Sequence, residues 1–134
     1  MEANELMIGD YVIRKNVPKE ILIVDTIDSI RDIVYLDLDG LGITEKLENI
    51  EPIPLTPKIL EKNGFVQSMS HNWLIVIDNI MIEIREPEHN IAIWLDWAEH
   101  ETETYASYML PGPNYVHELQ HALRLCNITK EIVI

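Results

Sequence analysis

The sequence predicts an α+β fold, with a small SH3-like β-barrel at residues 1–53 followed by an α+β half at residues 54–134. Three observations favour this class. The first fifty residues hold several short apolar stretches between turn residues, which is typical of small barrels and curled sheets. Three prolines, at positions 52, 54 and 57, mark a junction. Further apolar stretches and one amphipathic segment then follow.

The N-terminal half is predicted to consist of short strands. Residues 7–13 (MIGDYVI) and 20–27 (EILIVDTI) are apolar, and the second stretch is rich in β-branched side chains, as expected of a buried strand. Residues 32–39 (DIVYLDLD) alternate between apolar and acidic side chains, which is the period of a half-buried strand. The glycines of residues 40–44 (GLGIT) are expected to turn the chain.

A short helix is predicted at residues 57–63. Thr56 is a suitable N-cap, and a proline at the first helical position loses no hydrogen bond. Gly64 can adopt the left-handed conformation that commonly ends a helix. Both ends of this helix are therefore specified locally.

The second half is predicted to be mostly strand, with a polar loop at residues 99–103 and a closing edge strand at residues 131–134. Asp78 and Asn79 are suited to a two-residue hairpin turn. The main predicted strands are residues 72–77, 80–86, 90–97 and 104–110.

A last helix is predicted after residues 111–114 (PGPN), with either Asn114 or Gly112 as its N-cap. At about 100° per residue, its apolar side chains form one stripe. His117 and His121 fall on the opposite face, which we expect to be exposed to solvent. The stripe comprises Tyr115, Val116, Leu119, Ala122, Leu123 and Cys126.

This helix contains an H-E-x-x-H motif, formed by His117, Glu118 and His121. In zinc peptidases the two histidines bind the metal and the glutamate activates a water molecule. An exposed helix face provides no cavity for a catalytic metal, and Glu131 is the only acidic residue that follows. We therefore interpret the motif as coincidental and expect no metal, cofactor or catalytic residue. The alternative is a zinc-dependent hydrolase that uses all three side chains.

The charge of the chain argues against direct binding to nucleic acid. Its formal net charge is −13, from 10 basic and 23 acidic residues. Affinity for a phosphate backbone depends largely on lysine and arginine, and an acidic surface repels it. A solubilising surface, a basic protein partner, or mimicry of DNA by an anti-restriction protein are each compatible with this charge.

The sequence also predicts a cytoplasmic protein. Its longest purely apolar run, residues 73–77, is far shorter than a membrane span. The N-terminal residues do not show the pattern of a secretory signal peptide. The single cysteine, Cys126, is more typical of an intracellular protein than of a small secreted one.

Four residues are candidates for an interaction surface. Trp94 lies beside Asp96 and faces away from the apolar row of its predicted strand. We expect it either to be covered by the last helix or, if it is exposed, to mark a contact surface. Asp37 and Asp39 are predicted to lie on the wet face of their strand.

Two segments carry a resemblance to a known family. They comprise Pro52, Ile53, Pro54, Leu55, Thr56, Leu60, Gly64 and Phe65, then Tyr115, Val116, His117, Leu119 and Gln120. In these positions the chain resembles a family of short uncharacterised proteins of gut bacteria, their mobile elements and their phages. The resemblance implies a strand-rich N-terminal part and an apolar strand at the C-terminus. It also implies that Glu118 and His121 are incidental, and it brings no catalytic residues.

The leading prediction is thus a non-enzymatic protein-interaction or accessory protein of phage or mobile-element type. A zinc-dependent hydrolase and an acidic DNA mimic are the alternatives. The SH3-like barrel favours binding only by analogy between folds.

Overall fold

The computed structural model describes residues 1–86, 90–94 and 107–134. By its internal contacts the chain divides into two units. The first unit comprises Met1–Pro54 and Tyr115–His121, and the second comprises Leu55–Asn114 and Ala122–Ile134. The boundary after Pro54 lies one residue later than the predicted boundary, which is after residue 53. The first unit also includes Tyr115–His121, which the predicted division assigns to the second half.

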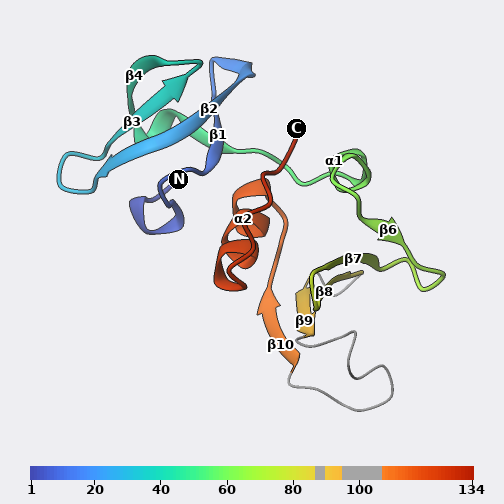
Figure 1. Cartoon of the computed structure of the whole chain (residues 1–134). Coiled ribbons are helices and arrows are strands. Elements are labelled where there is room, and N and C mark those ends of the chain that lie inside the picture. The colour runs from blue at the N-terminus through green and yellow to red at the C-terminus, as the bar shows by residue number, and fades with distance from the viewer. Residues whose placement is uncertain (87–89, 95–106) are drawn as a thin grey trace. The chain divides into compact units, whose positions relative to one another are not determined.

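The first unit contains an open antiparallel sheet with the strand order β4-β3-β2-β1-β5 (Figure 1). The strands are β1 (Tyr11–Arg14), β2 (Val17–Asp28), β3 (Ile33–Leu38), β4 (Leu41–Lys46) and β5 (Ile50–Pro52). Two short 3-10 helices, η1 (Ala3–Glu5) and η2 (Leu47–Asn49), accompany the strands. Antiparallel sheets together with α-helices confirm the α+β class. The closed SH3-like barrel is not seen, because β4 and β5 are the two edges of the sheet.

The turn between β3 and β4 lies earlier than the sequence suggested. Asp39 and Gly40 have φ angles of 50° and 86°, and Leu38 pairs directly with Leu41. A two-residue hairpin with both central residues at positive φ favours an Asp-Gly pair. Of the turn predicted at residues 40–44, only Gly40 lies in the turn, because the Asp-Gly pair completes it and β4 begins at Leu41.

One core stabilises the first unit. Along β2, the side chains of Leu22 and Val24 are fully buried, while Ile21 and Ile23 on the other face of the strand are 39% and 38% exposed. Burying one such apolar side chain contributes about 1.5–3 kcal/mol. The core comprises Leu6, Val12, Leu22, Val24, Val34, Leu36, Leu47 and Ile50.

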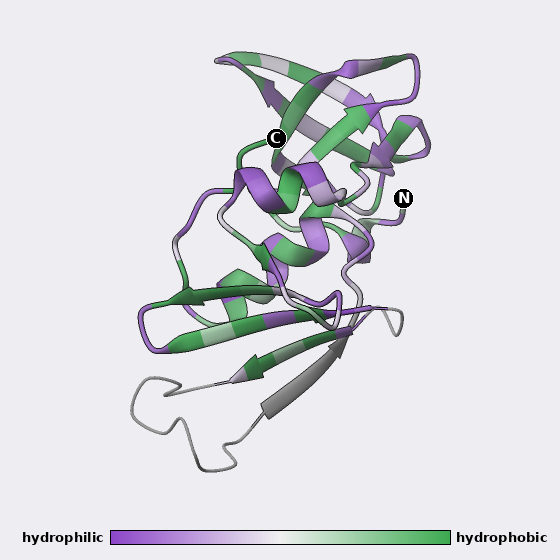
Figure 2. Ribbon diagram, turned by 90° about the vertical axis from the view of Figure 1, so that its right-hand side faces the viewer, coloured by the Kyte–Doolittle hydropathy of each residue, from purple (hydrophilic) through white to green (hydrophobic). Residues whose placement is uncertain are grey.

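The second unit contains an antiparallel sheet with the strand order β10-β9-β8-β7-β6. The strands are β6 (Val66–Gln67), β7 (Trp73–Ile77), β8 (Ile80–Arg85), β9 (Asn90–Trp94) and β10 (Ser107–Pro111). Strands β7 and β8 are largely hydrophobic (Figure 2). The helices are α1 (Pro57–Lys62) and α2 (Val116–Leu125), and α2 begins in the first unit.

Local signals predicted the elements around α1 and β7 correctly. The Thr56 hydroxyl accepts a hydrogen bond from the Ile59 N–H at 3.3 Å, and Gly64 has a φ angle of 88°. Ile77 pairs with Ile80, which confirms the two-residue turn between them. Parts of the strands predicted at residues 90–97 and 104–110, and the whole loop predicted at residues 99–103, lie outside the described residues.

The C-terminal residues 131–134 do not form the predicted edge strand. Instead, Val133 pairs with the side chain of Asn63, which is 2% exposed. Asn63 Nδ2 donates to Val133 O at 2.7 Å, and Asn63 Oδ1 accepts from Val133 N at 2.8 Å. The carboxamide thus takes the place of a neighbouring strand, because it presents one donor and one acceptor side by side.

Within the described residues, no helix is both long enough and apolar enough to cross a membrane.

We expect Asn63→Ala to lower the free energy of unfolding by about 2–4 kcal/mol, because three hydrogen bonds are lost and the backbone N–H and C=O of Val133 lose their partner. The third of these bonds joins Asn63 Nδ2 to Ile59 O at 2.7 Å. Urea unfolding measures the change. Asn16→Ala, in the exposed turn after β1, is the matched control and should change stability by less than about 0.5 kcal/mol. Equal effects of the two substitutions would contradict this role of Asn63.

Candidate functional site

The candidate site lies at the start of α2, where the H-E-x-x-H motif is found. The helix begins at Val116, and the N–H of Tyr115 donates to Glu118 Oε2 at 3.1 Å. Tyr115 therefore occupies the N-cap position, and neither Asn114 nor Gly112 does. The Glu118 carboxylate acts as one half of a capping box. Its negative charge is also favourable near the positive end of the helix dipole.

The histidine-bearing face of α2 is not exposed as predicted. His117 is 5% exposed and Gln120 is 8% exposed, and the side chain of His121 is 21% exposed. Gln120 Oε1 accepts from Tyr11 N at 2.9 Å, and its Nε2 donates to Gly9 O at 3.1 Å. The helical projection failed because the N-terminal segment of the first unit covers this face through polar contacts, which an apolar stripe does not reveal.

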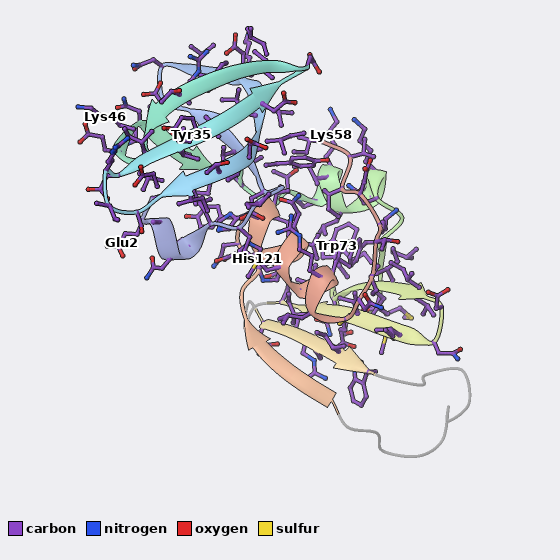
Figure 3. The ribbon with its side chains drawn as sticks, turned by 60° about the vertical axis from the view of Figure 1, so that its left-hand side comes forward. Glu2, Tyr35, Lys46, Lys58, Trp73 and His121 are labelled. Atoms are coloured by element: carbon purple, nitrogen blue, oxygen red, sulfur yellow. The ribbon has the colours of Figure 1, made fainter. Side chains whose placement is uncertain are left out.

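Asp10 is the polar centre of this segment, and it is fully buried. Its Oδ2 lies 2.8 Å from Nε2 of His121, a residue that projects from α2 (Figure 3). The same oxygen accepts from Met7 N at 2.7 Å. The backbone of Asp10 also accepts from Val24 N at 2.9 Å, which ties the carboxylate to β2. A buried carboxylate requires such partners, because an unpaired one would cost several kcal/mol.

His117 lies between two rings. Its ring centroid is 5.9 Å from that of Tyr115 in a stacked geometry, and 5.5 Å from that of His121 in an edge-on geometry. His117 Nδ1 is buried and has no hydrogen-bond partner. Burial lowers the pKa of His117 below its ordinary value of 6.5, although the carboxylates of Asp10, Glu118 and Glu5 act to raise it. His117 is therefore neutral at pH 7.

A pocket of about 480 Å³ opens beside these residues, within the first unit. We call it the histidine pocket, and its polar lining comes from Asn4, Glu5, Tyr115, His117, Glu118 and His121. Pockets of this size accommodate small ligands. No sequence pattern indicates this pocket, because Asn4 and Glu5 are more than a hundred residues from α2.

The geometry does not assemble a zinc-peptidase site from the described residues. Among residues 1–86, 90–94 and 107–134, no group of three or more histidine, cysteine, aspartate or glutamate side chains is placed to hold a metal ion. In a zinc peptidase the motif glutamate must reach a metal-bound water, whereas Glu118 accepts from the start of its own helix. His89 and His100 lie outside the described residues.

The four residues proposed as an interaction surface do not form one surface. Asp37 is half-buried on β3, whereas Asp39 lies in the turn after that strand rather than on its face. Trp94 is half-buried on β9, in the other unit. Asp96 lies outside the described residues.

Cys126 is half-buried rather than part of the core. Burial raises the pKa of its thiol, so that the less nucleophilic protonated form dominates at neutral pH.

A second surface of interest is the outer face of the first sheet, which the sequence reading missed. The strand register places Tyr11, Ile23, Asp37 and Gly42 in one row across four strands. Ile23 is 38% exposed, and so is Tyr35, which lies on the same sheet (Figure 3). Residues 21–24 of β2 are apolar on both faces, a pattern that predicts full burial rather than an exposed apolar face.

A hollow adjoins this row. It measures about 490 Å³, and its lining includes Asp25, Tyr35, Asp37 and Gly42. A Cβ atom added to Gly42 would meet no other atom within 4 Å. Gly42 therefore leaves open space next to an aromatic ring and two carboxylates.

Comparisons with protein-family models, with curated proteins and with solved structures find no match to this chain.

We predict that His117 makes the fold less stable in mild acid. The pKa of His117 is lowered in the folded state, so the unfolded chain binds a proton first as the pH falls. The free energy of unfolding should therefore decrease below about pH 6.5, with a slope of up to ~1.4 kcal/mol per pH unit. His117→Phe, which keeps a stacked ring, should remove this part of the slope.

Urea unfolding at a series of pH values measures this slope. His71→Asn is the control, because His71 is exposed and an asparagine tolerates its φ angle of 66°. Identical pH profiles for the native chain and His117→Phe would show that burial of His117 has no such consequence.

We also predict that tag-free protein purified without added metal does not carry one equivalent of zinc, because His121 Nε2 faces Asp10 and Glu118 caps its helix. Elemental analysis of the native chain and of the double variant His117→Ala/His121→Ala provides the measurement. Stoichiometric zinc that is lost in the double variant would establish a metal site here and contradict the coincidental interpretation.

Proposed function

We propose that this chain is a non-enzymatic protein-interaction or accessory protein, and that its first unit binds a basic, partly apolar segment of a partner protein. The observation that carries the proposal is the outer face of the first sheet. There, Ile21 and Ile23 stay exposed on strand β2, whose other face is buried at Leu22 and Val24.

The apolar part of this face is continuous in the strand register. Ile23 pairs with Tyr11, and Ile21 pairs with Ile13 on the same two strands. Cross-strand partners lie on the same face, with Cβ atoms about 4.5–5.5 Å apart. Contiguous exposed apolar surface on a globular protein is typical of an interaction site. Tyrosine is also favoured in such sites, because it combines a large apolar area with a polar end.

Acidic side chains border the same face, and their negative charge favours a basic partner. Asp37 pairs with Ile23, and Glu51 pairs with Ile13 from the edge strand β5. The whole chain has a net charge of −13. Charge complementarity of this kind speeds association and disfavours acidic partners such as nucleic acid. In a bound partner segment, apolar side chains would pack on the isoleucines. Lysine or arginine side chains of the segment would lie beside the carboxylates.

The form of the sheet supports an incomplete SH3-like barrel. Strand β2 is twelve residues long, and its pairing with β3 shifts register between Val24 and Thr26. Such irregularities bend a sheet. The 3-10 helix η2 then leads directly into the short β5, which pairs with β1. The association of such barrels with binding is an analogy between folds. A cytoplasmic location and a phage or mobile-element origin belong to the same proposal.

Selection from a displayed peptide library, followed by NMR mapping on the full chain, tests the proposal. We expect the selected peptides to combine lysine or arginine with apolar residues, and their binding to weaken with salt. Ile23→Thr should weaken binding at least tenfold, about 1.4 kcal/mol, and Gly42→Val should also weaken it by filling the hollow. Val76→Thr is the matched control, because Val76 is 53% exposed on β7.

Equal binding by Ile23→Thr and the native chain would overturn the proposal. Selection of peptides without basic residues would overturn it as well. A partner whose binding depends on carboxylates alone, and not on Ile23, would instead favour a DNA mimic.

A further inference from the structure

We propose that the outward-facing edge of strand β4 binds an extended, basic segment of a partner protein, which adds to the first sheet as a further strand. The segment pairs antiparallel with residues 41–44, and one of its arginine or lysine side chains crosses Gly42 to reach Asp37. This inference goes beyond the function proposed above, because it uses the backbone of β4 and not the isoleucines of β2.

The first step concerns the backbone groups of β4. This strand lies at one edge of the sheet, beside β3 (Figure 1). Leu38 pairs with Leu41 across the two-residue turn, and such a pair exchanges hydrogen bonds. Hydrogen-bonded pairs alternate along an antiparallel ladder, so Gly42 and Thr44 direct their N–H and C=O groups away from β3. No described residue outside the sheet bonds to these groups, which makes the edge a template for another strand.

The second step distinguishes this edge from the opposite one. Natural proteins protect sheet edges with short strands, prolines and charged side chains. Strand β5 has three residues and ends at Pro52, and Ile53 O directly after it accepts from Val116 N at 2.9 Å. Strand β4 has six residues and no proline. Its charged residues lie together at its end, where Glu45 Oε1 accepts from Lys46 N at 3.0 Å. The first four residues of β4 therefore carry no such protection.

The third step concerns the charge that an added strand would meet. Gly42 pairs with Asp37 on the outer face, and Asp25 also lines the hollow there. Neither carboxylate forms an ion pair with a described residue. A residue opposite Gly42 on the added strand would lie on the same face, about 10 Å from β3, because neighbouring strands are about 4.8 Å apart. Lysine and arginine are long enough to cross this distance, and Gly42 has no side chain in their path.

The fourth step concerns the other face of the added strand. Leu41 is 63% exposed, and Ile43 is half-buried beside the core. Alternate side chains of the partner would pack against them, because successive side chains of a strand point to opposite faces. A second copy of this chain is a poorer occupant. Two chains with a net charge of −13 repel each other, and residues 41–44 would bring no basic side chain to Asp37.

Titration of the full chain with a synthetic hexapeptide tests the proposal, with NMR observation of the amide groups of β4. The probe is acetyl-Lys-Thr-Val-Arg-Val-Lys-amide, whose arginine is designed to lie opposite Gly42. We expect saturable shifts and slower hydrogen exchange at Gly42 and Thr44. N-methylation of the arginine should weaken binding at least about tenfold, because it removes an N–H that faces β4. N-methylation of the valine before it should leave the affinity unchanged, because that N–H faces away.

Variants of the protein provide the complementary test. Thr44→Pro removes an outward N–H and should abolish binding, and proline is tolerated at such positions of an edge strand. Thr44→Val keeps the N–H and the shape of the side chain, and as the matched control it should bind as the native chain does. Asp37→Asn should weaken binding about two- to fivefold, as should citrulline in place of the probe's arginine. Cooperative thermal unfolding verifies that each variant is folded.

Equal affinities of the two N-methylated probes would overturn the proposal, as would native-like binding by a folded Thr44→Pro variant. Concentration-dependent dimers of the chain alone, which Thr44→Pro dissociates, would assign this edge to a second copy instead. Ile23→Thr should leave binding of the hexapeptide unchanged, because Ile23 lies on β2, two strands in from β4. Failure at the edge and failure at the outer face can therefore be told apart.

Discussion

The first unit depends on the burial of the polar face of α2 against the segment around Asp10. This burial is only possible because most of the polar atoms on that face find partners. Asp10 bonds to His121, and Gln120 takes one donor and one acceptor from the backbone of Gly9 and Tyr11. Left unpaired, each of the amide and backbone groups would cost about 1–3 kcal/mol, and the carboxylate of Asp10 would cost more. His117 Nδ1 is the exception, because it is a buried side-chain atom on this face without a hydrogen-bond partner.

Much of the local structure could be predicted because its causes lie within a few residues. Thr56 and Gly64 determine the ends of α1 through neighbouring backbone groups, and the turn after Ile77 needs only two residues. The burial of His117 and His121 could not be predicted in this way, since its partners lie more than a hundred residues earlier. An apolar stripe identifies one buried face of a helix. It gives no information about a second face that is buried by hydrogen bonds.

Two further failures have a common origin. Residues 131–134 look like a strand because they are apolar and β-branched, but a strand also requires a partner, and Val133 finds the side chain of Asn63 instead. Residues 21–24 of strand β2 look fully buried because all four are apolar, but only one face of the strand has a core to pack against. In both cases the composition indicates the secondary structure and burial that a segment favours, whereas its neighbours in the fold determine those that it adopts.

The H-E-x-x-H motif can be understood in the same terms. Glu118 caps the N-terminus of α2, His121 faces the buried Asp10, and His117 stacks with Tyr115 beside the pocket. These contacts are different, and each has its own local reason. A helix places residues i and i+4 on one face. Two histidines on that face therefore have the spacing of a metal site even when each has a different partner. The motif thus arises here from capping, hydrogen bonding and stacking, and no group of three or more metal-ligating side chains accompanies it among the described residues.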